Sequence, residues 1–262
     1  MSFAHVNGID LYYEDHGTGR PLLFLHGWGT SGRVWGAQVA DLARDHRTIT
    51  VDWRGCGRSD HPVDGNDTAG NAADVLALIA HLRLDRPVLV GSSVGATFAL
   101  EAALAAPERI GALVSVDGPG YWPSQGMAAQ LDALVADLAA DRAGTFADWV
   151  PNWYGPKASR AQVDWTVRQL LDSGVFIDAI FTECRTYDPR PALPRLAVPA
   201  AFVHGRQDTE IPVEVSRTLA ALAPHGELHV IEDAAHMPHQ ERPDAFNTVL
   251  RAALARTAPI AA

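Results

Sequence analysis

The chain has 262 residues, 31 of them acidic and 21 basic, and Lys157 is its single lysine. No Gly-Lys pair is present, so the sequence excludes a Walker A loop, and any Schiff-base chemistry would have to use Lys157. The formal net charge of −10 argues against binding to the phosphate backbone of nucleic acid, which depends on clustered Lys and Arg. We therefore expect no nucleic-acid partner.

Composition and cysteine usage indicate an ordinary globular protein, with 47% hydrophobic and 20% charged residues. Cys56 and Cys184 lie far apart and belong to no CxxC or Cys-His cluster, so we expect neither a disulfide framework nor a zinc ribbon. We also expect no other metal and no cofactor. The N-terminal residues lack the features of a signal peptide, and no apolar run approaches the length of a membrane span. We expect a cytoplasmic monomer or homodimer with a small-molecule substrate and no membrane partner.

Eight short strands are predicted in chain order. Residues 3–6 and 9–14 alternate between apolar and polar side chains, and the Asn7-Gly8 pair between them is typical of a tight hairpin turn. These two strands predict an antiparallel edge of a sheet. The other predicted strands are short apolar runs bounded by Gly, Pro or polar residues, as in buried parallel strands. These runs are residues 22–25, 48–51, 88–90, 113–116, 200–203 and 228–231.

Helical patterns separate these strands. Apolar residues between 75 and 82 recur at the spacing of a helix, and the largely apolar stretch 94–106 ends before Pro107. The alternation of strands and helices predicts an α/β protein with a mostly parallel, doubly wound sheet and an antiparallel N-terminal edge.

Residues 118–197 interrupt this alternation. The interval is much longer than a crossover between strands needs, and it holds ten of the chain's 20 aromatic residues. Helical patterns around 127–138 and 161–171 predict a helical insertion that folds over one end of the sheet. Its aromatic side chains either form the insertion's own small core or line a pocket. The tryptophans in question are Trp122, Trp149, Trp153 and Trp165.

A first glycine-rich motif, residues 27–32, matches G-x-G-x-x-G, and Asp52 follows it at the distance expected of a dinucleotide-binding site. Three features argue against that interpretation. Trp28 stands where the backbone would have to approach a pyrophosphate, the helical pattern begins only after Gly32, and the motif follows the third predicted strand instead of the first. We therefore disfavour nicotinamide chemistry.

A second motif, residues 91–95, reads Gly-Ser-Ser-Val-Gly and satisfies G-x-S-x-G between a predicted strand and a predicted helix. In that context the central serine occupies a sharp turn that lifts its hydroxyl above the sheet. Ser93 is therefore the predicted nucleophile. Ser92 is the alternative, but it lacks the symmetric glycine flanks.

A serine nucleophile needs a base and an acid that orients it. His236 follows the last predicted strand on a short loop, and Asp208 follows the strand 200–203, which gives the order Ser, Asp, His. Asp117, directly after another strand, is a second candidate for the acid. His239 could in principle join His236 at a metal, but no third ligand has suitable spacing.

These residues together resemble the α/β-hydrolase superfamily over essentially the whole chain. The resemblance implies a cap formed by residues 118–197 on a core of 1–117 and 198–262. It also implies an oxyanion hole made by the backbone N–H groups of Trp28 and Val94. The motifs that carry it are His26-Gly27-Trp28-Gly29, the D-x-R-G-x-G-x-S match at 52–59, the elbow 91–95, Gly205-Arg206-Gln207-Asp208 and the H-x-P-x-x-E-x-P match at 236–243. His26, Asp52, Arg54 and Asp60 are interpreted as residues that hold loops.

A serine at the elbow argues against haloalkane dehalogenases and epoxide hydrolases, which resemble this chain elsewhere but use an aspartate there. Carboxylesterases, lactonases, C–C bond hydrolases and cofactor-free perhydrolases remain compatible. We favour cleavage of an ester or lactone of a small, largely apolar molecule through an acyl-enzyme. The predicted substrate pocket contains Trp28, Ser92, Trp122, Trp149, Trp153 and Trp165.

Two alternatives remain open. The chain is also similar to cofactor-independent quinolone dioxygenases, which carry a Trp after the oxyanion His-Gly and a loop resembling residues 52–57. In those enzymes a histidine paired with an aspartate at the position of Asp117 deprotonates a heteroaromatic substrate, so His236 would act as base and Ser93 would only donate a hydrogen bond. The second alternative is a non-catalytic receptor or scaffold on the same fold.

Overall fold

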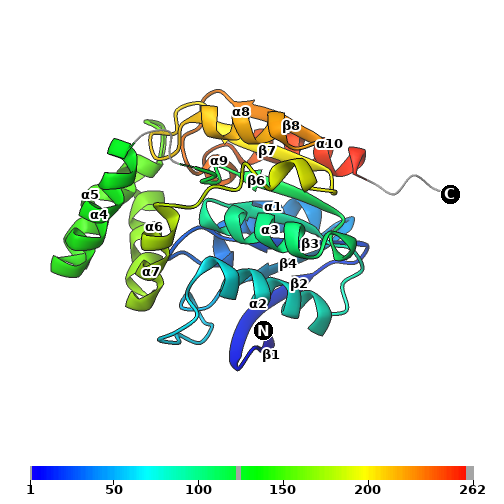
Figure 1. The fold of residues 1–262 in the computed structure, drawn as a ribbon, viewed down its shortest axis with the longest axis horizontal. Coiled ribbons are helices and arrows are strands. Elements are labelled where there is room, and N and C mark those ends of the chain that lie inside the picture. The colour runs from blue at the N-terminus through cyan, green and yellow to red at the C-terminus, as the bar shows by residue number, and fades with distance from the viewer. Residues whose placement is uncertain (1, 122–124, 258–262) are drawn as a thin grey trace.

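A computed structural model describes residues 2–121 and 125–257, so the predicted pocket residue Trp122 lies outside the described residues. In this part of the chain eight strands form one sheet in the order β1-β2-β4-β3-β5-β6-β7-β8 (Figure 1). The strands are β1 (Ser2–Val6), β2 (Ile9–His16), β3 (Arg20–Leu25), β4 (His46–Val51), β5 (Val88–Ser92), β6 (Ala112–Val116), β7 (Ala200–Gly205) and β8 (Gly226–Ile231).

The antiparallel edge lies at the N-terminus. β1 and β2 pair antiparallel across a turn in which Asn7 and Gly8 have φ values of 49° and 79°, as a two-residue hairpin turn of the I′ type requires. β2 then pairs antiparallel with β4, and every following pair of neighbouring strands is parallel. The predicted sheet and its antiparallel edge are confirmed.

Each predicted strand lies inside an observed one, and most observed strands are longer. β5 continues through Gly91 and Ser92, and β7 continues to Gly205, beyond the apolar runs that predicted them. Backbone hydrogen bonding between strands does not depend on an apolar side chain, so pairing extends to residues that a hydropathy pattern does not mark.

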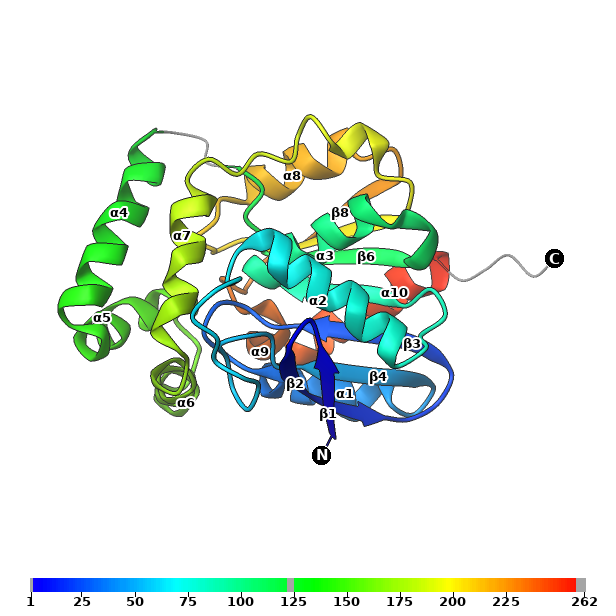
Figure 2. The same cartoon turned by 60° about the horizontal axis from the view of Figure 1, so that its bottom comes forward.

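Helices cover both faces of the sheet. α2 and α3 pack together on one face, and α1 and α10 pack together on the other (Figure 2). Because both faces are covered, all residues of β3 from 22 to 25 are completely buried, as their continuous apolar run predicts. These core helices are α1 (Gly36–Leu42), α2 (Thr68–His81), α3 (Val94–Ala105), α8 (Val213–Leu222), α9 (Pro238–Glu241) and α10 (Pro243–Arg256).

A second group of helices comes between β6 and β7 and lies beside the sheet, at the left of both views (Figures 1 and 2). Its α-helices are α4 (Gln125–Ala140), α5 (Arg142–Trp149), α6 (Arg160–Leu171) and α7 (Ala179–Cys184). The predicted helical stretches 127–138 and 161–171 fall within α4 and α6. Short 3-10 helices connect or flank them at Val150–Trp153, Val175–Asp178 and Leu193–Arg195; two others, Gly32–Trp35 and Pro107–Arg109, belong to the sheet region. In the described residues no helix is long and apolar enough to cross a membrane.

Candidate active site

Ser93 occupies a sharp turn between β5 and α3. Its φ of 51° and ψ of −126° place it in a region that a residue with a side chain rarely adopts, which is a strained conformation. The flanking glycines make room for this turn. A Cβ on Gly91 would lie 2.3 Å from the carbonyl oxygen of Gly95, and a Cβ on Gly95 would lie 2.4 Å from the carbonyl oxygen of His26. The G-x-S-x-G pattern therefore follows from close approach of the backbone on both sides of Ser93.

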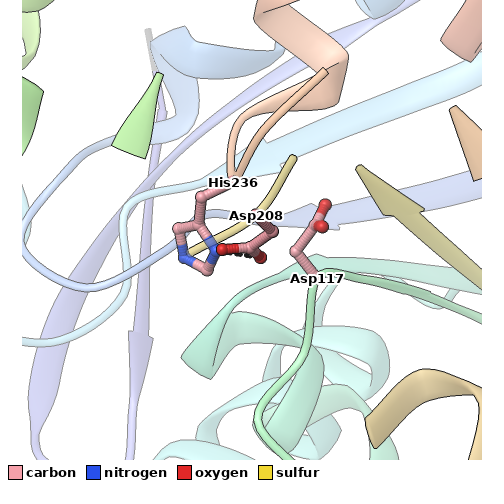
Figure 3. A group of neighbouring side chains, drawn as sticks. All are labelled: Asp117, Asp208 and His236. Carbon is pink, nitrogen blue, oxygen red and sulfur yellow. Dashed lines mark hydrogen bonds and ion pairs between the residues drawn. The ribbon is translucent and has the colours of Figure 1, made fainter. Parts of the chain in front are cut away.

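His236 and Asp208 meet on neighbouring loops, after β8 and β7 respectively. His236 Nδ1 lies 2.8 Å from Asp208 Oδ2, and Figure 3 shows this contact as a dashed line. The other carboxylate oxygen of Asp208 accepts the backbone N–H groups of Glu210 and Ile211, at 2.8 and 3.0 Å. The backbone N–H of His236 donates to the carbonyl of Trp153 at 3.0 Å. Both side chains are therefore held in place from several directions.

This pairing decides the protonation of both groups. Burial disfavours the charged form of Asp208, but the charge and hydrogen bond of His236, with His204 and the Ile211 N–H, together outweigh burial, and the pKa of Asp208 falls below its usual value. Burial also opposes the charged form of His236, but the Asp208 carboxylate, with smaller contributions from Glu210 and Glu241, outweighs burial, so the pKa of His236 rises. Because Nδ1 donates to the carboxylate, neutral His236 leaves Nε2 unprotonated and able to accept a proton.

Asp117 lies beside this pair, at the end of β6 (Figure 3). It is completely buried, and its Oδ1 accepts the backbone N–H of Gly205 at 2.8 Å. Burial raises the pKa of Asp117 well above its usual range, and the neighbouring Asp208 carboxylate adds to that rise. A protonated Asp117 can donate a hydrogen bond to Asp208, while the bond of His236 goes to Asp208.

The three groups Asp117, Asp208 and His236 are also the one set of described residues whose ligand atoms, within 4.8 Å of one another, could hold a metal ion. Two of those atoms, Nδ1 of His236 and Oδ2 of Asp208, already face each other across a hydrogen bond. A protonated Asp117 would be a poor ligand, since metals bind carboxylates in their ionised form. The geometry therefore favours acid-base chemistry over metal binding.

Two other histidines near the site are buried, and burial lowers the pKa of both. His204 Nε2 lies 3.5 Å from both Asp117 Oδ1 and Asp208 Oδ2. His204 Nε2 lies 2.8 Å from the carbonyl of Ile211 and therefore carries the proton, while its Nδ1 lies 2.8 Å from Ser216 Oγ. His239 stacks on Trp35 with ring centroids 4.3 Å apart, and burial lowers its pKa to about 3. His239 thus packs in the core.

Loop positions that resemble family motifs hold the backbone near the site. His26 Nδ1 lies 2.7 Å from the carbonyl of Gly27 and so donates to it, and its Nε2 accepts the backbone N–H of Trp53 at 3.2 Å. Burial lowers the pKa of His26 to about 3, so it stays neutral. In the same way Asp60 accepts the backbone N–H of Asp10 at 2.8 Å.

Asp52 and Arg54 also hold loops. Asp52 accepts the backbone N–H groups of Gly32 at 2.7 Å and Arg58 at 2.9 Å. Its carboxylate therefore binds the glycine-rich loop itself, where a dinucleotide-binding site would direct an acid to a ribose. Arg54 forms a buried two-pronged pair with Asp74, through Nε at 2.7 Å and Nη2 at 2.8 Å.

Ser93 and His236 line the same cavity, which has a volume of about 80 Å³. Trp28, Trp149 and Trp153 line it as well. Val94 does too, and because it is the first residue of α3 its N–H has no intrahelical acceptor. The cavity residues that the sequence analysis did not assign to the pocket include Thr30, Pro119, Leu131, Phe181, Glu210, Ile211 and Met237.

Two predicted pocket residues are not among the described residues that line this cavity. Ser92 is the last residue of β5 and is completely buried, because successive side chains of a strand point to opposite faces and the turn lifts only the next residue. Trp165 on α6 is partly buried and packs against the hydrophobic core cluster. For Trp165 the structure favours the packing interpretation.

Comparison with known proteins agrees with this arrangement. Residues 20–243 match the family model described as alpha/beta hydrolase fold. The chain is 30% identical over 256 residues to the AB hydrolase superfamily protein YisY of Bacillus subtilis, a match that covers 92% of this chain and 94% of that protein. It is 28% identical over 250 residues to a pimeloyl-[acyl-carrier protein] methyl ester esterase of Aliivibrio salmonicida, with coverage of 92% and 94%.

A solved structure shows the same likeness in three dimensions. An esterase from Exiguobacterium antarcticum superimposes with a TM-score of 0.91 at 26% sequence identity, covering 96% of this chain and 98% of that one. The family match extends over most of the chain and includes every strand of the parallel sheet. The chain belongs to the α/β-hydrolase family, and it is a hydrolase.

Proposed function

We propose that this protein cleaves a carboxylic ester or lactone of a small molecule through an acyl-enzyme, with Ser93, His236 and Asp208 as catalytic triad. The observation that supports this most directly is the shared cavity. Ser93 on its strained turn and His236 in contact with Asp208 both open onto it. A nucleophile, a base and an acid that orients the base are the groups that acyl transfer needs.

In the proposed mechanism the unprotonated Nε2 of His236 removes the proton of Ser93, and Oγ attacks the substrate carbonyl carbon. The N–H groups of Trp28 and Val94 stabilise the resulting oxyanion. Protonated His236 then gives its proton to the leaving alcohol as the C–O bond breaks. His236 next removes a proton from a water molecule, whose oxygen attacks the acyl carbonyl carbon. The bond between that carbon and Ser93 Oγ then breaks, Oγ takes the proton back from His236, and the carboxylic acid leaves.

Asp208 is the proposed acid because it contacts His236 directly. Its two hydrogen bonds from backbone N–H groups hold one carboxylate oxygen, and the other faces Nδ1. Asp117 lies beside Asp208, and its own Oδ1 accepts the backbone N–H of Gly205. The dioxygenase alternative requires His236 to work with Asp117, and the observed bond to Asp208 favours hydrolysis.

Residues 118–197 are the proposed cap. Leu131, Trp149, Trp153 and Phe181 come from this segment and line the cavity opposite Ser93. These side chains are large and apolar, so the cap would select small, apolar acyl groups by the space that it leaves.

The test is covalent labelling and turnover of the purified protein. A fluorophosphonate probe should label wild-type protein at Ser93, identified by mass spectrometry, and Ser93→Ala should lose both labelling and hydrolysis of short p-nitrophenyl esters. Ser92→Ala is the matched control and should still be labelled. Full turnover in Ser93→Ala would reject the acyl-enzyme. Oxygen uptake with 3-hydroxy-4-quinolones would instead support dioxygenation.

A further inference from the structure

Glu210 places a carboxylate on the wall of the proposed active-site cavity. It stands two residues after Asp208 on the loop between β7 and α8, and it lines the cavity together with Ser93 and His236. Its Oε2 accepts the indole N–H of Trp149 at 2.7 Å. Within residues 2–121 and 125–257, no Lys or Arg forms an ion pair with Glu210. Burial raises the pKa of Glu210, and the charge of His236 and the Trp149 hydrogen bond oppose that rise. In the proposed mechanism this carboxylate contacts no reacting group.

Aromatic rings surround the same space. The ring centroids of Trp28 and Phe181 are 4.8 Å apart, and those of Trp149 and Trp153 are 4.9 Å apart. Arg142 already lies over the Trp28 ring, with its guanidinium carbon 5.5 Å from the centroid. Trp149, Trp153 and Phe181 also line the cavity, and aromatic faces attract a positively charged nitrogen.

A wider groove adjoins the cavity on the outside. Its volume is about 760 Å³, and it shares Leu131, Trp149 and Glu210 with the cavity. Asp137, Asp141 and Asp148 also line it, and none of its described lining residues is Lys, Arg or His. Carboxylates of one sign around a concave surface raise the local concentration of cations. The acidic side chains of the groove thus continue as far as Glu210 at the cavity, and they favour a positively charged ligand there.

The cavity and the groove differ in volume, and this difference indicates which part of an ester would lie beside Glu210. The inner cavity of about 80 Å³ is much smaller than a pocket for a drug-sized ligand, so it suits a short acyl group next to Ser93. The rest of a larger ester would have to lie outside the cavity, and the groove that shares Leu131, Trp149 and Glu210 with it is the adjoining space. The leaving group would therefore cross the boundary at Glu210.

We propose that the leaving group of the substrate carries a positively charged nitrogen, bound between the Glu210 carboxylate and the aromatic rings of the cavity. This inference rests on the proposed ester hydrolysis and specifies its substrate class. The reaction is hydrolysis of a short-chain ester of an amino alcohol, which consumes water and yields a carboxylic acid and a cationic alcohol.

The test compares two esters of the same shape. Choline acetate carries a quaternary nitrogen where 3,3-dimethylbutyl acetate has a neutral carbon, and proton release measures hydrolysis of both. We expect wild-type kcat/KM to favour the cation by about tenfold or more, and Glu210→Gln to reduce that ratio by about tenfold. The amide oxygen of this variant would still accept the Trp149 N–H. The matched control is Glu214→Gln, which removes an exposed carboxylate paired with Arg217 and should leave the ratio unchanged.

Each outcome has a distinct meaning. A wild-type ratio of the two kcat/KM values near one would overturn the inference, because the site would not distinguish the cation. An equal loss of kcat/KM on both esters in Glu210→Gln would also overturn it, because Glu210 would then act only through the charge of His236. If neither ester is hydrolysed, the proposed function fails. The cation site is then tested on its own by measuring the binding of two alcohols. Tryptophan fluorescence would then compare choline with 3,3-dimethylbutan-1-ol: tighter choline binding that Glu210→Gln abolishes supports the cation site, and equal binding of the two alcohols contradicts it.

Discussion

The two walls of the cavity are held in place by different forces. The wall that carries Ser93 and His236 consists of loops that follow parallel strands. Hydrogen bonds of backbone N–H groups hold Ser93, Asp208 and His236 in these loops. The opposite wall comes from the segment between β6 and β7, and the rings of Trp149, Trp153 and Phe181 contact one another there. Directional bonds fix angles and distances, whereas ring packing fixes volume. We therefore expect changes to the triad residues of the first wall to alter kcat, and changes to the apolar side chains of the second wall to alter the choice of acyl group.

The largest effect is expected from Asp208→Asn. The amide would still accept the backbone N–H groups of Glu210 and Ile211, but it would no longer stabilise protonated His236 or fix its tautomer. We expect kcat on a short ester to fall about 10³- to 10⁴-fold, with little change in KM. Steady-state kinetics and a thermal unfolding curve on the same sample would show that chemistry, not folding, is lost.

Asp117→Asn is the control for this prediction. The amide N–H₂ could donate to Asp208 as protonated Asp117 does, so we expect a much smaller loss of kcat than in Asp208→Asn. The opposite ranking of the two variants would move the acid of the triad to the end of β6.

These two aspartates show how far the sequence could predict the strand-side wall. Ser93, His236 and Asp208 were found because each follows a strand in a local motif, and parallel strands end at the same edge of a sheet. The contact between Asp117 and Asp208 could not be predicted, since it depends on β6 and β7 being neighbours. Glu210 was missed for a similar reason, although its place two residues after Asp208 was a usable signal.

The opposite wall was less accessible to prediction. Its tryptophans were noticed by composition, but which of them face the cavity depends on how the helices are rotated when they dock. Trp165 packs against the core cluster, while Phe181, which no motif marks, lines the cavity. Short helices such as α5 were also missed, because the 8 residues of that helix are too few for a clear periodic pattern. The Asp141 side chain, which accepts the Gly144 N–H at 2.9 Å, was the local signal of its start.

A smaller effect should appear in the pH dependence of the strand-side wall. His236 must be unprotonated to accept the Ser93 proton, so kcat/KM should fall as the pH drops through its pKa. Burial lowers that pKa, but the carboxylates of Asp208, Glu210 and Glu241 together raise it further than burial lowers it, so the acidic limb should have its midpoint above the ordinary histidine value of about 6.5. In Asp208→Asn burial acts without the Asp208 carboxylate, and the residual activity should have an acidic limb at lower pH. An unchanged limb would mean that another group titrates there.

The smallest effect is expected from Phe181→Leu on the opposite wall. Phe181 lies against Trp28 and lines the cavity, so a smaller side chain enlarges the acyl site without touching Ser93 or His236. We expect kcat/KM to shift toward longer p-nitrophenyl esters by about tenfold relative to the acetate, the scale of one or two methylene groups in an apolar pocket. Phe176→Leu is the matched control, because Phe176 belongs to the same segment but is exposed and does not line the cavity. If both variants keep the wild-type preference for acyl chain length, the segment between β6 and β7 does not set acyl specificity. If Phe181→Leu instead lowers kcat equally on all esters, this wall affects the chemical step as well, and the two walls do not have separate roles.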